Sequence, residues 1–128
     1  MVTQLKAGDI SPTQAIEAAF DRIDAVESQV RALPTLCKDR ALAAAAALET
    51  NTALQNDRRD DPAWLAGLPI AIKDLSDVEG VRSTHGSPIF ADLIPDASDL
   101  LVEHLENNGA IVIGKSNTPE FGAGGNSF

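Results

Sequence analysis

The chain has 128 residues, 44% of them hydrophobic and 23% charged, and a net charge of −9. That length suits one ordinary domain, no stretch is apolar enough to span a membrane, and the amino end lacks the pattern of a signal peptide, so we expect a cytoplasmic protein. The 19 acidic against 10 basic residues argue against direct nucleic-acid binding, and the single cysteine excludes an internal disulfide and a zinc site of paired thiolates.

The first strong signal along the chain is a helix start. Ser11 can cap the helix, Pro12 fits its first position, and Gln14 completes a capping box. Apolar residues then recur at three- and four-residue steps to about Ser28, which predicts one helix face packed in the core. This stripe consists of Ile16, Ala19, Phe20, Ile23 and Val26.

A second helix is expected after a short extended passage at residues 33–36. Asp39 can cap this helix, which should run through the alanine-rich stretch 41–48. Residues 51–62 have no apolar period and are typical of a solvated connector. Trp64 and its neighbour Leu65 then return the chain to the core.

Residues 67–74, GLPIAIKD, are typical of a buried strand that ends in two charged residues, Lys73 and Asp74. Strand ends are common places for functional sites. However, lysine is almost never fully buried unless it is paired, so these residues by themselves favour a solvated strand end.

An irregular segment should follow over residues 77–96, because it contains several glycines and prolines. A connection of ~20 residues in a compact domain is usually functional. We expect its apolar residues to hold it against the core: Ile89, Phe90, Leu93 and Ile94.

The next signals predict a helix and a strand. Asp96 or Ser98 can cap the helix, Asp99 lies in its first turn, and Asn108-Gly109 is a stop signal. The residues expected on its apolar face are Leu101, Val102 and Leu105.

The strand predicted at residues 110–113 should lie parallel to the one around Ile70. Strand, long connection with a helix, and strand is the pattern of a right-handed crossover. The carboxyl ends of both strands then share one edge of the sheet, which places Lys73 and Lys115 together where α/β sheets bind ligands. The fold class is therefore α/β, with a mixed sheet flanked by helices.

Residues 109–116, GAIVIGKS, satisfy the phosphate-binding pattern G-x-x-x-x-G-K-[ST], but the context argues against that function. The four intervening residues have the character of a strand instead of a loop, and a turn follows Lys115 in place of a helix. Asn117 is better explained by hydrogen bonds to neighbouring backbone, and Thr118 by capping a short helix.

The remaining polar and glycine-rich positions carry weaker signals. His104 lies on the polar side of its helix, and no motif recruits His85 as a base or metal ligand. The stretch Gly122, Ala123, Gly124 and Gly125 has permissive backbone that could approach a ligand closely.

Two long stretches resemble the amidase signature family of amide hydrolases, in the correct order and spacing. They are GLPIAIKDLSDVEGVRSTHGS, residues 67–87, and DASDLLVEHLENNGAIVIGKSNTPEFGAGGNS, residues 96–127. The helical segment 11–30 is also similar to the family's amino-terminal helices. The resemblance implies that the chain is the amino-terminal part of a single amidase domain, with residues 1–62 as a helical lead-in and 63–128 as the start of the α/β core.

The family resemblance assigns a role to Lys73. Members cleave carboxamides with a serine nucleophile, a second serine on a cis peptide bond and a lysine that ends the motif P-[IV]-A-[IV]-K-D, and here that lysine is Lys73. Asp74, Thr84 and Asn117 match structural positions near the site, and Gly122 to Gly125 would line the substrate pocket. Leu75 stands where many members have asparagine.

The resemblance also implies what the 128 residues do not contain. The family's serine-rich block would follow Phe128, so we expect the chain alone to be inactive, with Ser116 and Ser127 lying in the wrong blocks to replace the nucleophile. No metal or organic cofactor is implied, and the expected substrate is a small amide.

Two alternatives and one kind of association remain open. One alternative is the family's subunit that amidates glutamate on misacylated tRNA with ammonia from glutamine. The other is a non-catalytic remnant or binding module. Self-association through an incomplete sheet edge is expected in either case.

Overall fold

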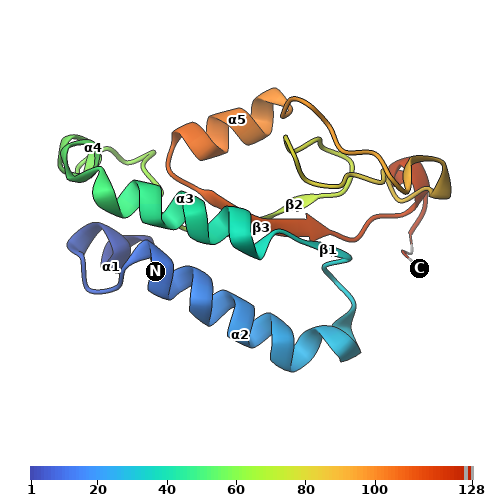
Figure 1. Ribbon diagram of the computed structural model, residues 1–128, viewed down its shortest axis with the longest axis horizontal. Helices are drawn as coiled ribbons and strands as arrows, with labels where there is room; N and C mark the ends of the chain where they lie inside the picture. Colours follow the sequence, from blue (N-terminus) through green and yellow to red (C-terminus); the bar gives the residue numbers. More distant parts are fainter. Residues whose placement is uncertain (126, 128) are drawn as a thin grey trace.

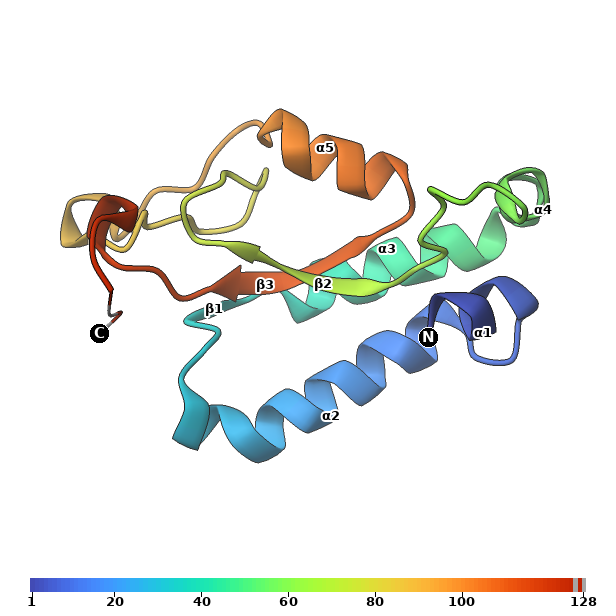
Figure 2. The same cartoon turned by 180° about the vertical axis from the view of Figure 1, so that it is seen from behind.

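A computed structural model of the chain describes residues 1–125 and 127. It is a mixed α/β arrangement, as predicted, with a three-stranded sheet between two layers of helices (Figures 1 and 2). The strands are β1 (Thr35–Leu36), β2 (Pro69–Lys73) and β3 (Ile111–Ser116). The helices are α1 (Val2–Ala7), α2 (Pro12–Val30), α3 (Lys38–Thr50), α4 (Thr52–Arg58), α5 (Leu100–Asn107), and the short 3₁₀ helices η1 (Pro88–Phe90) and η2 (Glu120–Gly122).

The sheet has the order β1-β3-β2, so β3 is its central strand. β2 and β3 are parallel, which confirms the predicted pairing direction, whereas β1 and β3 are antiparallel. Helices α2 and α3 pack on one face of β3 and α5 lies on the other (Figure 2). None of the helices among residues 1–125 has the length and apolar character needed to cross a membrane.

The predicted capping box begins α2. The Ser11 side chain accepts a hydrogen bond from the backbone N–H of Gln14, and the Gln14 side chain accepts one from the backbone N–H of Ser11. Ile16, Phe20 and Ile23 are buried against α3 and β3, as the apolar stripe predicted.

Three local predictions are corrected. Helix α3 begins one residue before Asp39, which lies in its first turn, and Cys37 occupies the cap position without a side-chain capping bond. The supposed connector at 51–62 contains α4, whose amino end is capped by Asn51. Asp99 is the N-cap residue of α5, and Leu101 is exposed there, while Val102 is fully buried.

The long segment between β2 and α5 is held differently from the prediction. Ile89 and Ile94 are exposed, by 76% and 63%, so they do not anchor it. Val78 and Val81 anchor it in the core under α5, and backbone hydrogen bonds join its two halves, from Gly80 N–H to Pro95 O and from Ser83 N–H to Leu93 O. These bonds join residues 80–83 to residues 93–95, and Ser83 is completely buried between them and the sheet.

Candidate active site at the carboxyl edge of the sheet

The pairing of β2 with β3 determines which side chains meet at the predicted ligand edge. Ile70 pairs with Val112, but the next residue, Ala71, pairs with Gly114, so β3 carries one extra residue at this point. Such a bulge shifts the later residues of β3 to the opposite face of the sheet. Lys115 therefore pairs with Ile72, which packs in the core under α5.

Lys73 ends β2 and is exposed to solvent. It pairs with Ser116 of β3, and the ladder continues one step further, where the Asp74 N–H donates to Ser116 O over 2.9 Å. Side chains alternate between the faces of a strand. Since Ile72 and Asp74 are buried and Lys73 is exposed, Lys73 lies on the face opposite to both.

Lys115 is fully buried and has two partners. Its Nζ lies 3.1 Å from Asp74 Oδ1 in an ion pair, and it donates to Ser83 Oγ over 2.5 Å. Asp74 is 1% exposed and Ser83 is completely buried. A buried charge is tolerated only when it is paired and hydrogen-bonded, and both conditions are met here.

Thr84 supplies the other donors to Asp74. Its backbone N–H donates to Asp74 Oδ1 over 3.0 Å, and its hydroxyl donates to Asp74 Oδ2 over 2.5 Å. The carboxylate thus accepts two hydrogen bonds from Thr84 and forms an ion pair with Lys115. We call Asp74, Ser83, Thr84 and Lys115 the buried polar cluster.

The contact between Lys115 and Ser83 brings a lysine and a serine together, as some hydrolases do, but its setting is wrong for catalysis. Asp74 holds Lys115 Nζ in an ion pair, so this amine is not free to accept a serine proton. The Ser83 hydroxyl also donates to Val81 O over 3.2 Å. The cluster is therefore a structural connection between β2, β3 and the segment that contains Ser83.

A cavity of about 490 Å³ lies beside this cluster. It is lined by Pro34, Asp74, Arg82, Thr84, Gly86, Ser87, Pro88, Ala91, Asn117, Thr118 and Glu120. Ser87 donates to Glu120 across 2.7 Å, and Arg82 donates to Ala91 O. The predicted capping by Thr118 is wrong, since Pro119 occupies the cap position of η2 and Thr118 Oγ1 is buried without a partner among the described residues.

Asn117 connects the edge of the sheet to the end of α2. Its backbone N–H donates to Ala32 O, its side-chain amide donates to Arg31 O, and its Oδ1 accepts from Thr118 N–H.

The glycine-rich stretch lies beside the strand end instead of in this cavity. Gly122 has a left-handed backbone, and a Cβ there would lie 2.6 Å from Leu75 Cδ1. Ala123, Gly124 and Gly125 are exposed. The structure thus places Gly122 next to the residue that follows Lys73 and Asp74.

His85 is fixed by aromatic packing. Its ring packs edge-on against Phe90, which in turn contacts Phe121 edge-on, and its backbone carbonyl accepts from Phe121 N–H. Within residues 1–125 and 127, no three His, Cys, Asp or Glu side chains are grouped closely enough to hold a metal ion.

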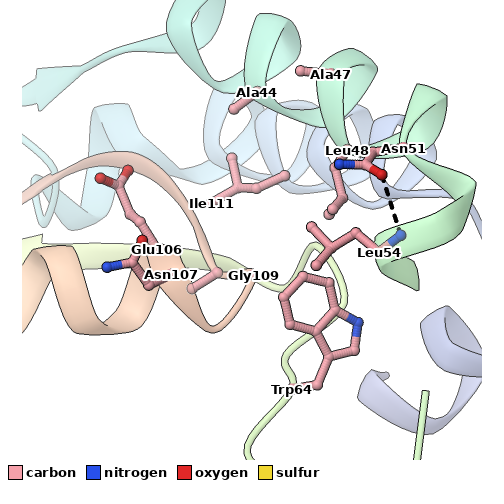
Figure 3. A pocket seen from close by; sticks show the side chains of 11 residues that line it. Ala44, Ala47, Leu48, Asn51, Leu54, Trp64, Glu106, Asn107, Gly109 and Ile111 are labelled. Carbon is pink, nitrogen blue, oxygen red and sulfur yellow. Dashed lines mark hydrogen bonds between the residues drawn. The ribbon is translucent and has the colours of Figure 1, made fainter. Parts of the chain in front are cut away.

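A second cavity, of about 450 Å³, lies at the other end of β3 (Figure 3). Trp64, Leu48 and Leu54 project into it, and the Asn51 side chain beside them accepts the capping bond from Leu54 N–H. Its lining is mostly apolar. It contains no arrangement of acid, base and nucleophile.

Comparison with known proteins gives a consistent result. The family model described as Amidase matches residues 14–127. The A-type subunit of the glutamyl-tRNA(Gln) amidotransferase from Koribacter versatilis (strain Ellin345) is 41% identical over 112 residues, which are 88% of this chain and 22% of that protein.

Solved structures agree with the sequence comparisons. A bacterial aryl acylamidase matches with a TM-score of 0.82 at 26% identity, over 98% of this chain and 26% of that one. The native peptide amidase of Stenotrophomonas maltophilia matches with a TM-score of 0.75 at 29% identity, over 92% of this chain and 24% of that one. The chain thus spans about a quarter of the length of these proteins.

Proposed function

Because this chain belongs to the amidase family, we propose that it is the part of an amide hydrolase that supplies the lysine base, Lys73. The observation that carries the proposal is the position of this residue. Lys73 ends the sequence PIAIKD, which matches the family's lysine motif, and it lies at the carboxyl end of a parallel strand. In α/β sheets, that edge is where ligands bind.

The chemistry proposed for Lys73 is proton transfer in amide cleavage. A serine hydroxyl attacks the carboxamide carbon and its proton passes through a bridging serine to the neutral lysine. The carbon–nitrogen bond then breaks as a proton returns to the leaving amine. Water subsequently hydrolyses the acyl-serine to the carboxylate and regenerates the serine.

We propose that residues 1–128 alone do not catalyse this reaction. The family's serine block has no counterpart in them, and neither buried Ser83 nor strand-end Ser116 is placed to replace it. Incubation of the purified chain with simple carboxamides should release no ammonia above background.

A chimera tests the role of Lys73. Residues 14–127 would replace the matching segment of the Koribacter versatilis protein, and ammonia release from glutamine would be measured in its assembled complex. We expect Lys73→Ala and Lys73→Arg to lower kcat by roughly 100-fold or more, because general-base catalysis is lost and a guanidinium does not give up its proton.

Lys38→Ala is the matched control for this chimera. Lys38 is an exposed lysine at the start of α3, and its removal should leave turnover within twofold of the parent chimera. An active chimera that keeps its turnover after Lys73→Ala would refute the assignment of Lys73 as the base.

A more specific candidate function is that of the A-type subunit in a glutamyl-tRNA(Gln) amidotransferase. The identities of 41% and 42% to the A-type subunits of this enzyme from Koribacter versatilis and Chloroflexus aurantiacus favour it. A gene for a companion subunit beside the gene for this chain would support this candidate. An isolated gene whose product hydrolyses simple amides without partners would favour an independent amidase.

The non-catalytic alternative has a direct test. The coding DNA downstream of the Phe128 codon should continue in frame into a glycine- and serine-rich block if the protein is an amidase. A stop codon at that point would support a remnant or binding module instead.

A further inference from the structure

The proposed base has a carboxylate as its neighbour in the chain, which is unfavourable for its task. Asp74 follows Lys73 directly, and a nearby negative charge stabilises the ammonium form of a lysine. A lysine that must accept a proton needs the opposite environment. The structure contains a second lysine, Lys115, that counteracts the carboxylate.

We propose that Lys115 is a positioning residue for Lys73, acting through Asp74. Lys115 holds the Asp74 carboxylate on the face of the sheet covered by α5, and it cancels the negative charge of that carboxylate. The Lys115–Asp74 pair has no net charge, so Lys73 on the opposite face has no uncompensated carboxylate beside it. The inference rests on the proposed function only for the statement that Lys73 is the base.

The geometry of the buried polar cluster carries this inference. Lys115 Nζ lies 3.1 Å from Asp74 Oδ1, and the exposed fractions of the two residues are 0% and 1%. Two more hydrogen bonds from Thr84 orient the carboxylate. Because the pair is shielded from water, solvent screens the attraction between its two charges only weakly.

Two charged groups near the cluster have hydrogen-bond partners of their own. Arg82, which lines the adjacent cavity, donates to the backbone oxygen of Ala91, and Glu120 accepts from Ser87. Asp77 lies 3.5 Å from His85 Nε2. Within the described residues, Lys115 is the only cation within ion-pair distance of Asp74.

The test measures the reactivity of Lys73 in the 128-residue chain itself. The chain would be acetylated with trace acetic anhydride between pH 7 and 9 at low ionic strength, and the extent at each lysine read by peptide mass spectrometry. Only the neutral amine reacts, so the labelling of Lys73 relative to exposed Lys38 reports its protonation. No amide hydrolysis is needed, so an inactive chain still gives a result.

Lys115→Met should lower the relative labelling of Lys73. It leaves the Asp74 carboxylate uncompensated, and an uncompensated charge on the neighbouring residue, screened mainly by water, corresponds to roughly threefold less labelling at fixed pH. The double variant Asp74→Asn/Lys115→Met removes both charges and should return the labelling to that of the parent. Lys115→Arg keeps the cation and should label as the parent does.

The double variant separates charge compensation from a structural effect. The direction of the change adds to this separation: if Lys115 only stabilised the fold, Lys115→Met would loosen the strand end and leave exposed Lys73 labelled at least as strongly as in the parent, whereas lost charge compensation lowers the labelling. Unchanged labelling in a folded Lys115→Met chain, or no reversal in the double variant, would overturn the proposal. If circular dichroism shows Lys115→Met to be unfolded, Asp74→Asn replaces it, with increased labelling expected and the same reversal in the double variant.

Discussion

Lys73 and Lys115 lie near the ends of neighbouring strands but in opposite environments, and one extra residue in β3 explains the difference. Ile113 is the extra residue of β3 and packs against α2 and α3. If Ile113 instead paired regularly with Ala71, alternation along β3 from Val112 would direct Lys115 toward the α2 and α3 face, away from Asp74. With the bulge, Lys115 meets Asp74, and Lys73 is the lysine that remains accessible.

The sequence predicted the shared edge of these two lysines but not their pairing partners. Strand order and parallel direction follow from the crossover pattern, which depends on long segments. A bulge depends on packing around one residue, and the amino-acid sequence of β3 contains no signal that predicts it. The identity of Lys73 as a candidate base came from family resemblance, since an exposed lysine at a strand end has no distinguishing physical signal.

Gly114 is a residue at which the structure demands glycine. A Cβ at this position would lie 2.5 Å from the backbone oxygen of Thr35, across the pairing of β1 with β3. Gly114→Ala should therefore lower the free energy of unfolding by about 1–3 kcal/mol, because the added methyl group would collide with the backbone of β1. Urea denaturation at pH 7 would measure it.

Gly125→Ala is the control, because a Cβ at Gly125 would meet no atom within 4 Å. Its free energy of unfolding should stay within about 0.5 kcal/mol of the parent. Equal denaturation midpoints for the two variants would show that β1 moves aside without cost.

At the scale of the element, predictions succeeded where a local signal and a tertiary contact agree. Helix α2 has both a capping box and an apolar stripe, and the stripe is buried. Helix α4 has no buried residue, so no apolar pattern could reveal its seven residues. In the segment before α5, the apolar Ile89 and Ile94 are exposed, because Val78 and Val81 supply its core contacts and backbone hydrogen bonds join its two halves.

Helices α2 and α3 are joined by an interaction that should depend on pH. The Glu49 carboxylate, near the end of α3, accepts a hydrogen bond of 2.8 Å from Thr13 N–H in the first turn of α2. Burial alone would raise the pKa of Glu49, but hydrogen bonds from Thr13 and Ser11 outweigh it and hold the pKa below its ordinary value of 4.5. A carboxyl group whose pKa is lowered by folding stabilises the fold above its ordinary pKa.

Glu49→Gln should lower the free energy of unfolding by about 0.3–1 kcal/mol at pH 7, a range set by the near-surface position of the bond. The difference from the parent should persist down to about pH 4.5. It should then fade as the pH drops through the lowered pKa of the folded state. Urea denaturation from pH 7 to 3 would measure it, with Glu17→Gln on the exposed side of α2 as control. A difference that is constant across this range would contradict the assignment.

At the scale of the whole molecule, the strands of the sheet differ in their exposure to solvent. The central strand β3 is buried from Ile111 to Lys115, whereas on β2 only Ile72 is buried. Within the described residues, β2 has no strand on its outer side. The chain also spans about a quarter of its relatives' length, so the same fold in those proteins includes much more polypeptide.

We propose that the free edge of β2 makes the 128-residue chain self-associate. Unpaired backbone groups on an edge strand favour pairing with another chain, and a charged side chain on the edge opposes it. The weight-average mass from light scattering should therefore rise with concentration, and Ala71→Lys, on the exposed face of β2, should reduce the rise. Ala43→Lys adds the same charge at an exposed position of α3 and should leave association unchanged. A monomer at every concentration, or an equal effect of both substitutions, would show that association does not use this edge.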